Sequence, residues 1–234
     1  MASDPIKAVL TDPAATGLRD RKKARRRQEI LQAAGQLFAR NGFDATTIAE
    51  IAEDCGVSPP TVFNYFGSKE NILSALIFEG TERERAQHLQ SPRKTGIPFA
   101  EAIGGLLYEC TENTMQIAGK RVWRYAEAAN IRRPNSEFEQ LFSYSDAELC
   151  KLIETYLSDY AIVLRSGQTP DNALLARLFY NHWTALYFAY IKDDPMPLDR
   201  HKRDIMADVS GIVAMLFDEE FAESSPLKPK AAVS

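Results

Sequence analysis

The sequence predicts an all-α protein with about nine helices, arranged as an N-terminal three-helix helix-turn-helix domain followed by a larger helical domain. Apolar residues recur at the spacing of amphipathic helices through almost the whole chain, and no useful stretch shows the alternation of a β-strand. Glycine- and proline-containing breaks separate the helical segments. A chain of 234 residues with 45% hydrophobic composition is long enough to bury a sizeable core.

The first predicted helix runs from about Arg21 to Arg40. Asn41-Gly42 follows it, and both residue types accept the left-handed conformation that ends helices. The apolar side chains of this helix fall on one stripe, which predicts that one face packs into a core. They are Ile30, Ala33, Ala34, Leu37 and Phe38.

Two short helices are predicted next. Thr47 and Glu50 have the spacing of a capping box, which marks the start of the second helix, and Gly56 ends it. Ser58 is placed to cap the third helix. Pro59 and Pro60 then occupy its first two positions, where no intrahelical N–H donor is needed. The paired prolines therefore stiffen the start of a helix and do not break it.

A fourth helix is predicted from Ser68 towards Glu84, and the segment QSPRKTGIP (90–98) reads as a linker. Five later helices are predicted at Phe99–Ala118, Lys120–Ile131, Ser136–Leu164, Asp171–Lys192 and Asp199–Phe221. The predicted organisation is a disordered arm (1–18), a three-helix helix-turn-helix domain (19–67), a connecting helix (68–89), a larger helical domain (98–221) and a disordered tail (222–234).

The first three helices have helix-turn-helix geometry, in which the helix after the turn lies in the DNA major groove. Val62 and Phe66 are predicted to face inward, which leaves Thr61, Asn64 and Tyr65 on or near the exposed side. An asparagine amide pairs with the edge of adenine, whereas hydroxyls and the Lys69 ammonium suit phosphate oxygens. The alternative for each residue is an ordinary solvated helix face or core packing.

The run TTIAEIAEDCGVSPPTVFNYFGSKENIL (46–73) resembles the DNA-binding segment of the TetR family of transcriptional regulators. With the preceding EILQAAGQLFARNGF, the resemblance covers about the first eighty residues. Two residues depart from the family pattern at the third helix. Phe63 stands where the family often has a phosphate-contacting tyrosine, and Pro60 replaces a usually small residue. Cys55, where alanine is usual, is interpreted as a small buried core residue and not as a sensor.

The run RDRKKARRR (19–27) leads into the first helix and is interpreted as an electrostatic attachment to phosphates, with part of the arm reaching a minor groove. Positive charge is thus concentrated at the predicted DNA-facing end of a chain whose net charge is −4. The predicted contacts with a palindromic double-stranded DNA operator are Arg25, Thr46, Thr47, Ser58, Pro60, Thr61, Asn64, Tyr65 and Lys69.

The family resemblance implies that the C-terminal half forms a homodimer and senses a small molecule. Helices 171–192 and 199–221 are predicted to meet their symmetry mates in a four-helix interface. Aromatic residues outnumber charges among the candidate pocket residues, which favours an apolar or aromatic effector. The ordinary alternative for each is core packing. The candidates are Leu107, Cys110, Met115, Trp123, Phe142, Tyr156, Phe179, His182 and Trp183.

Other classes of function find little support. Three scattered histidines and the lack of HExxH or GxSxG motifs argue against an enzyme, and no cofactor or metal site is predicted. Cysteine usage favours a reducing, cytoplasmic location, and no stretch suggests a signal peptide or membrane span. Two alternatives remain: a thiol redox-responsive regulator using Cys110 and Cys150, and a small-molecule binding protein with weakened DNA binding.

Overall fold

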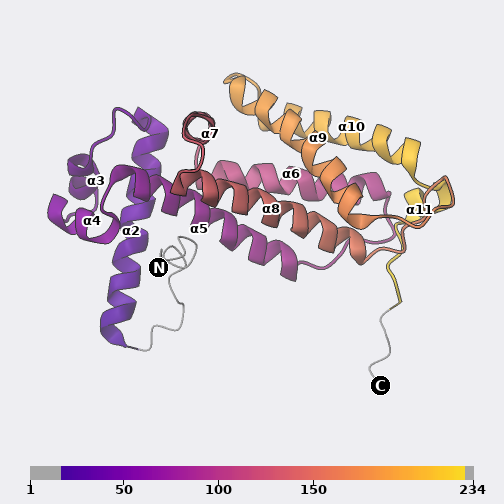
Figure 1. Cartoon of the computed structure of the whole chain (residues 1–234), viewed down its shortest axis with the longest axis horizontal. Coiled ribbons are helices and arrows are strands. Elements are labelled where there is room, and N and C mark those ends of the chain that lie inside the picture. Colours follow the sequence, from indigo (N-terminus) through magenta and orange to yellow (C-terminus); the bar gives the residue numbers. More distant parts are fainter. Residues whose placement is uncertain (1–16, 230–234) are drawn as a thin grey trace. The chain divides into compact units, whose positions relative to one another are not determined.

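The computed structural model describes residues 17–229, and within them the chain forms ten helices and no extended strand (Figure 1). The all-α prediction is confirmed. Residue contacts divide the chain into two compact units, one of residues 1–83 and 114–145 and the other of residues 84–113 and 146–234. The division falls inside three helices and differs from the predicted domain boundaries. The predicted arm lies outside the described residues, except for its last two positions.

The first unit begins with helices α2 (Leu18–Asn41), α3 (Ile48–Asp54) and α4 (Pro59–Phe66). It also holds most of α5 (Lys69–Gln90), the end of α6 (Phe99–Ile117), α7 (Lys120–Arg132) and the start of α8 (Glu137–Ser158). The predicted inward stripe of α2 is buried. Phe38 packs on Phe43 with 5.1 Å between ring centroids, and Phe43 stacks on Tyr125 of α7 at 4.3 Å.

The second unit contains α9 (Asn172–Lys192), α10 (Leu198–Leu216) and α11 (Glu219–Ser224), with the remaining parts of α5, α6 and α8. Helices α9 and α10 run side by side (Figure 1). An aromatic cluster forms part of its core: the ring of Phe99 lies 4.9–5.3 Å from those of Tyr160, Phe217 and Phe221. The fully buried Phe99 therefore fixes the start of α6 against segments far away in sequence.

Two helices end earlier than predicted. The helix expected over 136–164 stops at Ser158, because Tyr160 and Leu164 form isolated antiparallel bridges with Leu227 and Phe217. The helix expected over 199–221 stops at Leu216. Asp218 then caps the separate helix α11 by accepting hydrogen bonds from the backbone N–H groups of Glu220 and Phe221.

The segments expected to be a linker and a disordered tail are held by specific hydrogen bonds. In the linker, the Lys94 carbonyl accepts a 2.7 Å hydrogen bond from the Tyr160 hydroxyl. In the tail, the Ser225 hydroxyl donates to the carbonyl of Ile97 at 2.7 Å, and the backbone N–H of Gly96 donates to the Ser224 carbonyl. The prediction of disorder is wrong for residues 222–229, while residues 230–234 lie outside the described part.

Candidate nucleic-acid interface

The third helix, α4, presents the predicted residues outward because two side chains anchor its other face. Val62 and Phe66, one turn apart, are buried against the rest of the first unit. Asn64 is exposed, whereas Thr61 and Tyr65 are half-buried. The amide of Asn64 is therefore free to meet a partner in front of the helix.

Both prolines stand where they were predicted, at the first two positions of α4. The Ser58 hydroxyl does not cap the backbone as expected. Pro60 has no N–H to offer, and the N–H of Thr61 donates to the Ser58 carbonyl instead. The Ser58 hydroxyl lies 2.9 Å from that of Thr61. Two hydroxyls thus sit together at the exposed start of α4.

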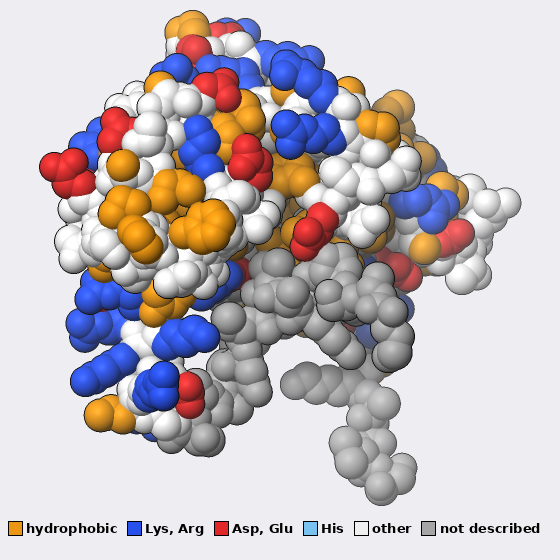
Figure 2. All heavy atoms as spheres, turned by 60° about the vertical axis from the view of Figure 1, so that its left-hand side comes forward, with side chains coloured by type: hydrophobic (Ala, Val, Ile, Leu, Met, Phe, Trp, Pro, Cys, Tyr) orange, Lys and Arg blue, Asp and Glu red, His pale blue; other side chains and the backbone are white. Residues whose placement is uncertain are grey.

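Phe63 contributes an unusual feature to the exposed face of α4. Its side chain is 59% exposed, and the neighbouring Pro59 and Pro60 are exposed as well. Figure 2 shows an apolar patch on this side of the first unit. The outward face of α4 therefore combines a polar amide with an apolar surface.

The basic run is part of α2 and not a tether that precedes it. Residues 19–27 hold seven Lys or Arg side chains and one acid, all within the first half of the helix. Lysine and arginine side chains gather at the lower end of the same face in Figure 2. Arg25 is exposed, and its Nε lies 3.1 Å from the Glu29 carboxylate, which Arg26 also approaches.

Thr46 is not a candidate contact, contrary to the sequence prediction. Its side chain is completely buried and donates a 2.8 Å hydrogen bond to the carbonyl of Gly42. Thr47 is exposed and forms the predicted capping box, accepting from the Glu50 backbone N–H and donating to the Glu50 carboxylate. These two threonines secure the loop and the start of α3.

Lys69 has a role that the sequence did not suggest. Its ammonium donates to the carbonyls of Phe43 and Thr46 at 2.7 Å and of Asp44 at 3.2 Å. The same nitrogen lies 4.5 Å from the centroid of the Phe43 ring. Because an ammonium has three donors, these bonds satisfy it fully. Lys69 therefore ties the loop between α2 and α3 to the start of α5, and its predicted phosphate contact has no free donor in this arrangement.

An ion pair inside the first unit was also missed by the sequence reasoning. Arg27 of α2 pairs with Glu79 of α5, and both side chains are only 12–13% exposed. The Arg27 guanidinium lies 4.9 Å from the centroid of the Phe66 ring, at the end of α4. Residues 27, 66 and 79 are far apart in sequence. No local sequence pattern therefore predicts the contacts among them.

The nine candidate pocket residues are divided between the two units. Met115, Trp123 and Phe142 belong to the first unit and the other six to the second. All except Met115 and His182 are buried. The indole N–H of Trp123 donates to the Thr114 carbonyl, and that of Trp183 donates to the Thr111 hydroxyl, both at 2.9 Å. His182 lies at the surface, with Nε2 2.9 Å from the Asp208 carboxylate.

The three cysteines are free thiols. Burial raises the pKa of the Cys110 thiol to about 12 and also raises the pKa values of Cys55 and Cys150. A thiol with a raised pKa supplies little of the reactive thiolate. Cys55 is half-buried and not fully buried as predicted, with its sulfur 3.7 Å from the carbonyl oxygen of Glu29.

Residues 17–229 contain no cluster of three or more His, Cys, Asp or Glu side chains arranged to hold a metal ion. None of the helices described in this range has the length and apolar character needed to cross a bilayer.

Comparison with known families places the similarity in the segment that contains α3 and α4. Residues 30–76 match the family described as bacterial regulatory proteins, tetR family. The regulator UidR of Escherichia coli is 38% identical over 61 residues, which are 26% of this chain and 31% of UidR. The repressor BdcR of the same species is 32% identical over 94 residues, which are 39% of this chain and 46% of BdcR. The chain thus spans less than half the length of these curated relatives.

Solved structures share the fold over most of the chain. Salmonella enterica GusR superimposes with a TM-score of 0.58 at 20% sequence identity, covering 88% of this chain and 98% of GusR. FadR of Bacillus subtilis, solved in complex with stearoyl-CoA, has a TM-score of 0.54 at 17% identity and covers 78% of this chain and 96% of its own. These likenesses concern the fold alone.

Proposed function

Because this chain belongs to the TetR family of bacterial regulators, we propose that it is a repressor that binds a palindromic DNA operator as a homodimer and is released by a small effector. The observation that carries the proposal is the exposed face of α4. Asn64 offers an amide that can pair with adenine, and Phe63 offers an apolar surface suited to a thymine methyl group. Val62 and Phe66 hold that face outward.

The basic half of α2 supplies the attraction to phosphate. Its exposed arginines and lysines give a local positive charge on a chain whose net charge is −4. This local positive charge steers the basic end of the protein towards DNA, whereas the rest of the chain, which is acidic, is repelled by it. Each phosphate neutralised contributes a slope of about −0.9 to the dependence of log K on log salt.

The dimer is proposed to form through α9 and α10. The outward side chains include Leu174 and Leu178 on α9 and Met215 on α10, all exposed in the single chain. A Cβ atom added at Gly211 would meet no heavy atom within 4 Å, so α10 has open space where a partner helix can approach closely. The apolar and small residues of this surface fit a four-helix interface between two copies.

The effector is proposed to be apolar or aromatic and to act on the helices that follow α4. FadR, whose fold is similar, was solved with stearoyl-CoA bound, so this architecture accommodates an acyl ligand in that protein. Helix α4 is the proposed recognition helix. Release requires that the effector bind better to a conformation in which the two α4 helices of the dimer are wrongly placed for DNA. Helix α5 begins three residues after α4 and continues into the second unit, so it is the proposed lever.

Selection of preferred sites from random duplex DNA tests the proposal, combined with light scattering of the protein alone and bound. We expect a two-fold symmetric consensus with half-sites about one helical turn, roughly 34 Å, apart, and a dimeric mass. Enrichment of no sequence, or a monomer at micromolar concentration with and without DNA, contradicts it. The thiol alternative predicts that blocking the cysteines abolishes binding. The binding-protein alternative predicts effector binding without any enriched DNA.

A further inference from the structure

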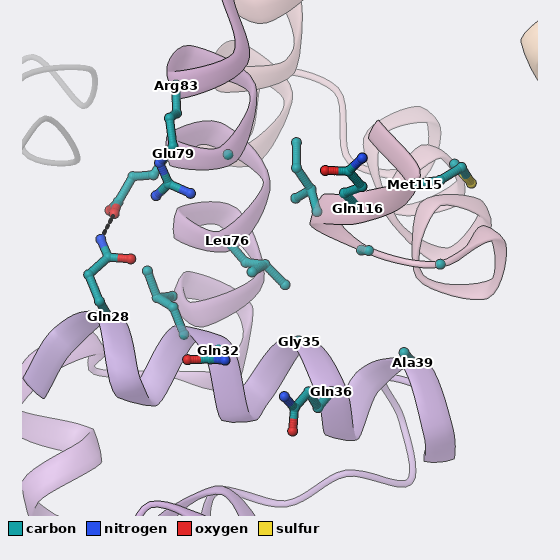
Figure 3. Close-up of a pocket in the computed structure, with 15 residues that line it drawn as sticks. Gln28, Gln32, Gly35, Gln36, Ala39, Leu76, Glu79, Arg83, Met115 and Gln116 are labelled. Atoms are coloured by element: carbon teal, nitrogen blue, oxygen red, sulfur yellow. Dashed lines mark hydrogen bonds between the residues drawn. The ribbon is translucent and has the colours of Figure 1, made fainter. Parts of the chain in front are cut away.

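A groove of about 520 Å³ opens within the first unit, between α2, α5 and the end of α6 with the turn that follows it (Figure 3). All of its lining residues belong to this unit. This volume lies in the range of small-molecule sites. Among the nine residues predicted to contact an effector, only Met115 lines it.

The groove is lined by both apolar and polar residues. Leu31, Leu76 and Ile117 provide apolar surface. Two glycines let the three segments come together: a Cβ at Gly80 would lie 2.8 Å from the Ile117 side chain, and one at Gly35 would touch Leu76 at 3.4 Å. The polar lining consists of Gln28, Gln32, Gln36, Glu79, Arg83 and Gln116.

The charges around the groove favour an anion. Glu79 is neutralised by Arg27 and also accepts a 3.2 Å hydrogen bond from the Gln28 amide, marked in Figure 3. Arg83 extends along α5 towards Glu79 in the same view and makes no ion pair within the described residues. The groove is therefore left with one unneutralised guanidinium beside several amide groups. A guanidinium binds a carboxylate with two parallel N–H donors.

We propose that this groove binds a small organic carboxylate with an apolar body, held by Arg83 and the glutamine amides, and that its occupation changes DNA affinity. The ligand part stands independently, whereas the regulatory part rests on the proposed DNA binding. A short series of contacts joins the groove to α4. Glu79 and Gln28 line the groove, Glu79 holds Arg27, and Arg27 lies against Phe66 of α4. A ligand that disturbs the Gln28–Glu79 contact therefore alters the support of the recognition helix.

Equilibrium dialysis of the full chain tests the ligand part with two carboxylates of different body, phenylacetate and octanoate, each against its neutral amide. We expect saturable binding of at least one carboxylate, about tenfold or more tighter than its amide, since a charge-assisted pair is lost in the amide. Arg83→Gln should remove this preference and Arg83→Lys should retain part of it. The matched control is Arg132→Gln, an exposed arginine at the end of α7 that does not line the groove.

A second variant locates the ligand. Gly35→Leu fills the groove and should weaken carboxylate and amide alike, while thermal denaturation checks that the protein folds. The proposal is overturned if neither carboxylate binds saturably, or if Arg83→Gln and Gly35→Leu both bind as the unmodified chain does. In the DNA arm, the carboxylate that binds should change affinity for a selected site, and this change should be lost in Arg83→Gln. Binding with no change in DNA affinity refutes the regulatory part. A chain that selects no DNA site refutes the proposed function, and dialysis still decides the ligand part.

Discussion

Replacing Lys69 by methionine tests whether this lysine stabilises the fold or binds a DNA phosphate. Methionine keeps the length and apolar stem of the side chain but removes the ammonium, which holds three loop carbonyls and faces the Phe43 ring. Two of the three bonds are 2.7 Å long and part-buried, and the third is exposed, so water can replace only that one easily. At about 1 kcal/mol net for each part-buried bond, the expected loss of unfolding free energy is about 2 kcal/mol.

Urea and thermal denaturation followed by circular dichroism measure this loss. For a protein of this size, about 2 kcal/mol corresponds to a fall in Tm of roughly 4–8 °C. The control is Lys22→Met in the exposed part of α2, which removes the same charge and should leave Tm unchanged. The Lys22 variant should instead lower the magnitude of the salt slope for DNA by about 0.9 if that lysine contacts a phosphate. If Lys69→Met leaves Tm unchanged but lowers that slope, the structural reasoning is refuted and the phosphate contact is restored.

Three other changes test separate features. Thr46→Val removes the bond to the Gly42 carbonyl and should cost about 1 kcal/mol of stability without altering DNA preference; a changed preference profile would show that Thr46 does reach the DNA. Gly211→Leu should shift the protein towards monomer in sedimentation at unchanged helical content, whereas an unchanged dimer would exclude α10 from the interface. Burial lowers the pKa of His88 in the folded protein, although the nearby Glu109 opposes this shift. Near pH 6 the unfolded chain therefore binds more protons than the folded chain. The free energy of unfolding should fall as the pH drops through about 6.5 towards the lower folded-state pKa. His88→Gln should flatten this decline measured by urea denaturation from pH 7.5 to 5.5, and an equally steep decline would assign it to other groups.

Local patterns were sufficient to predict the helix-turn-helix. The capping box at Thr47, the prolines at the start of α4 and the inward pair Val62 and Phe66 each follow from short-range spacing, and the structure confirms all three. Helix boundaries late in the chain were harder to predict. The segment after Ser158 has apolar residues that could continue a helix, but pairing of Tyr160 with Leu227, 67 positions away, ends it.

In the candidate interface too, features set by short-range spacing were predicted, and features set by contacts between distant residues were not. The exposure of Asn64 follows from helical spacing, and the structure agrees. The roles of Thr46 and Lys69 depend on the carbonyls of a loop 4 to 26 residues away in sequence, whose path the sequence does not specify. The Arg27–Glu79 pair and the groove beside it arise only when α2 meets α5, so neither could be located before the structure was known.

The central claim is that the exposed face of α4 reads base pairs, and the preference profile of Asn64→Ala on the selected site tests it most directly. Affinities for every single-base variant of the site are measured for the unmodified chain and for the alanine variant at one salt concentration. The account predicts that discrimination falls by about 1–3 kcal/mol at one or two base pairs in each half-site, with little change elsewhere and the same salt slope. A profile identical to that of the unmodified chain would contradict the assignment of base reading to this face.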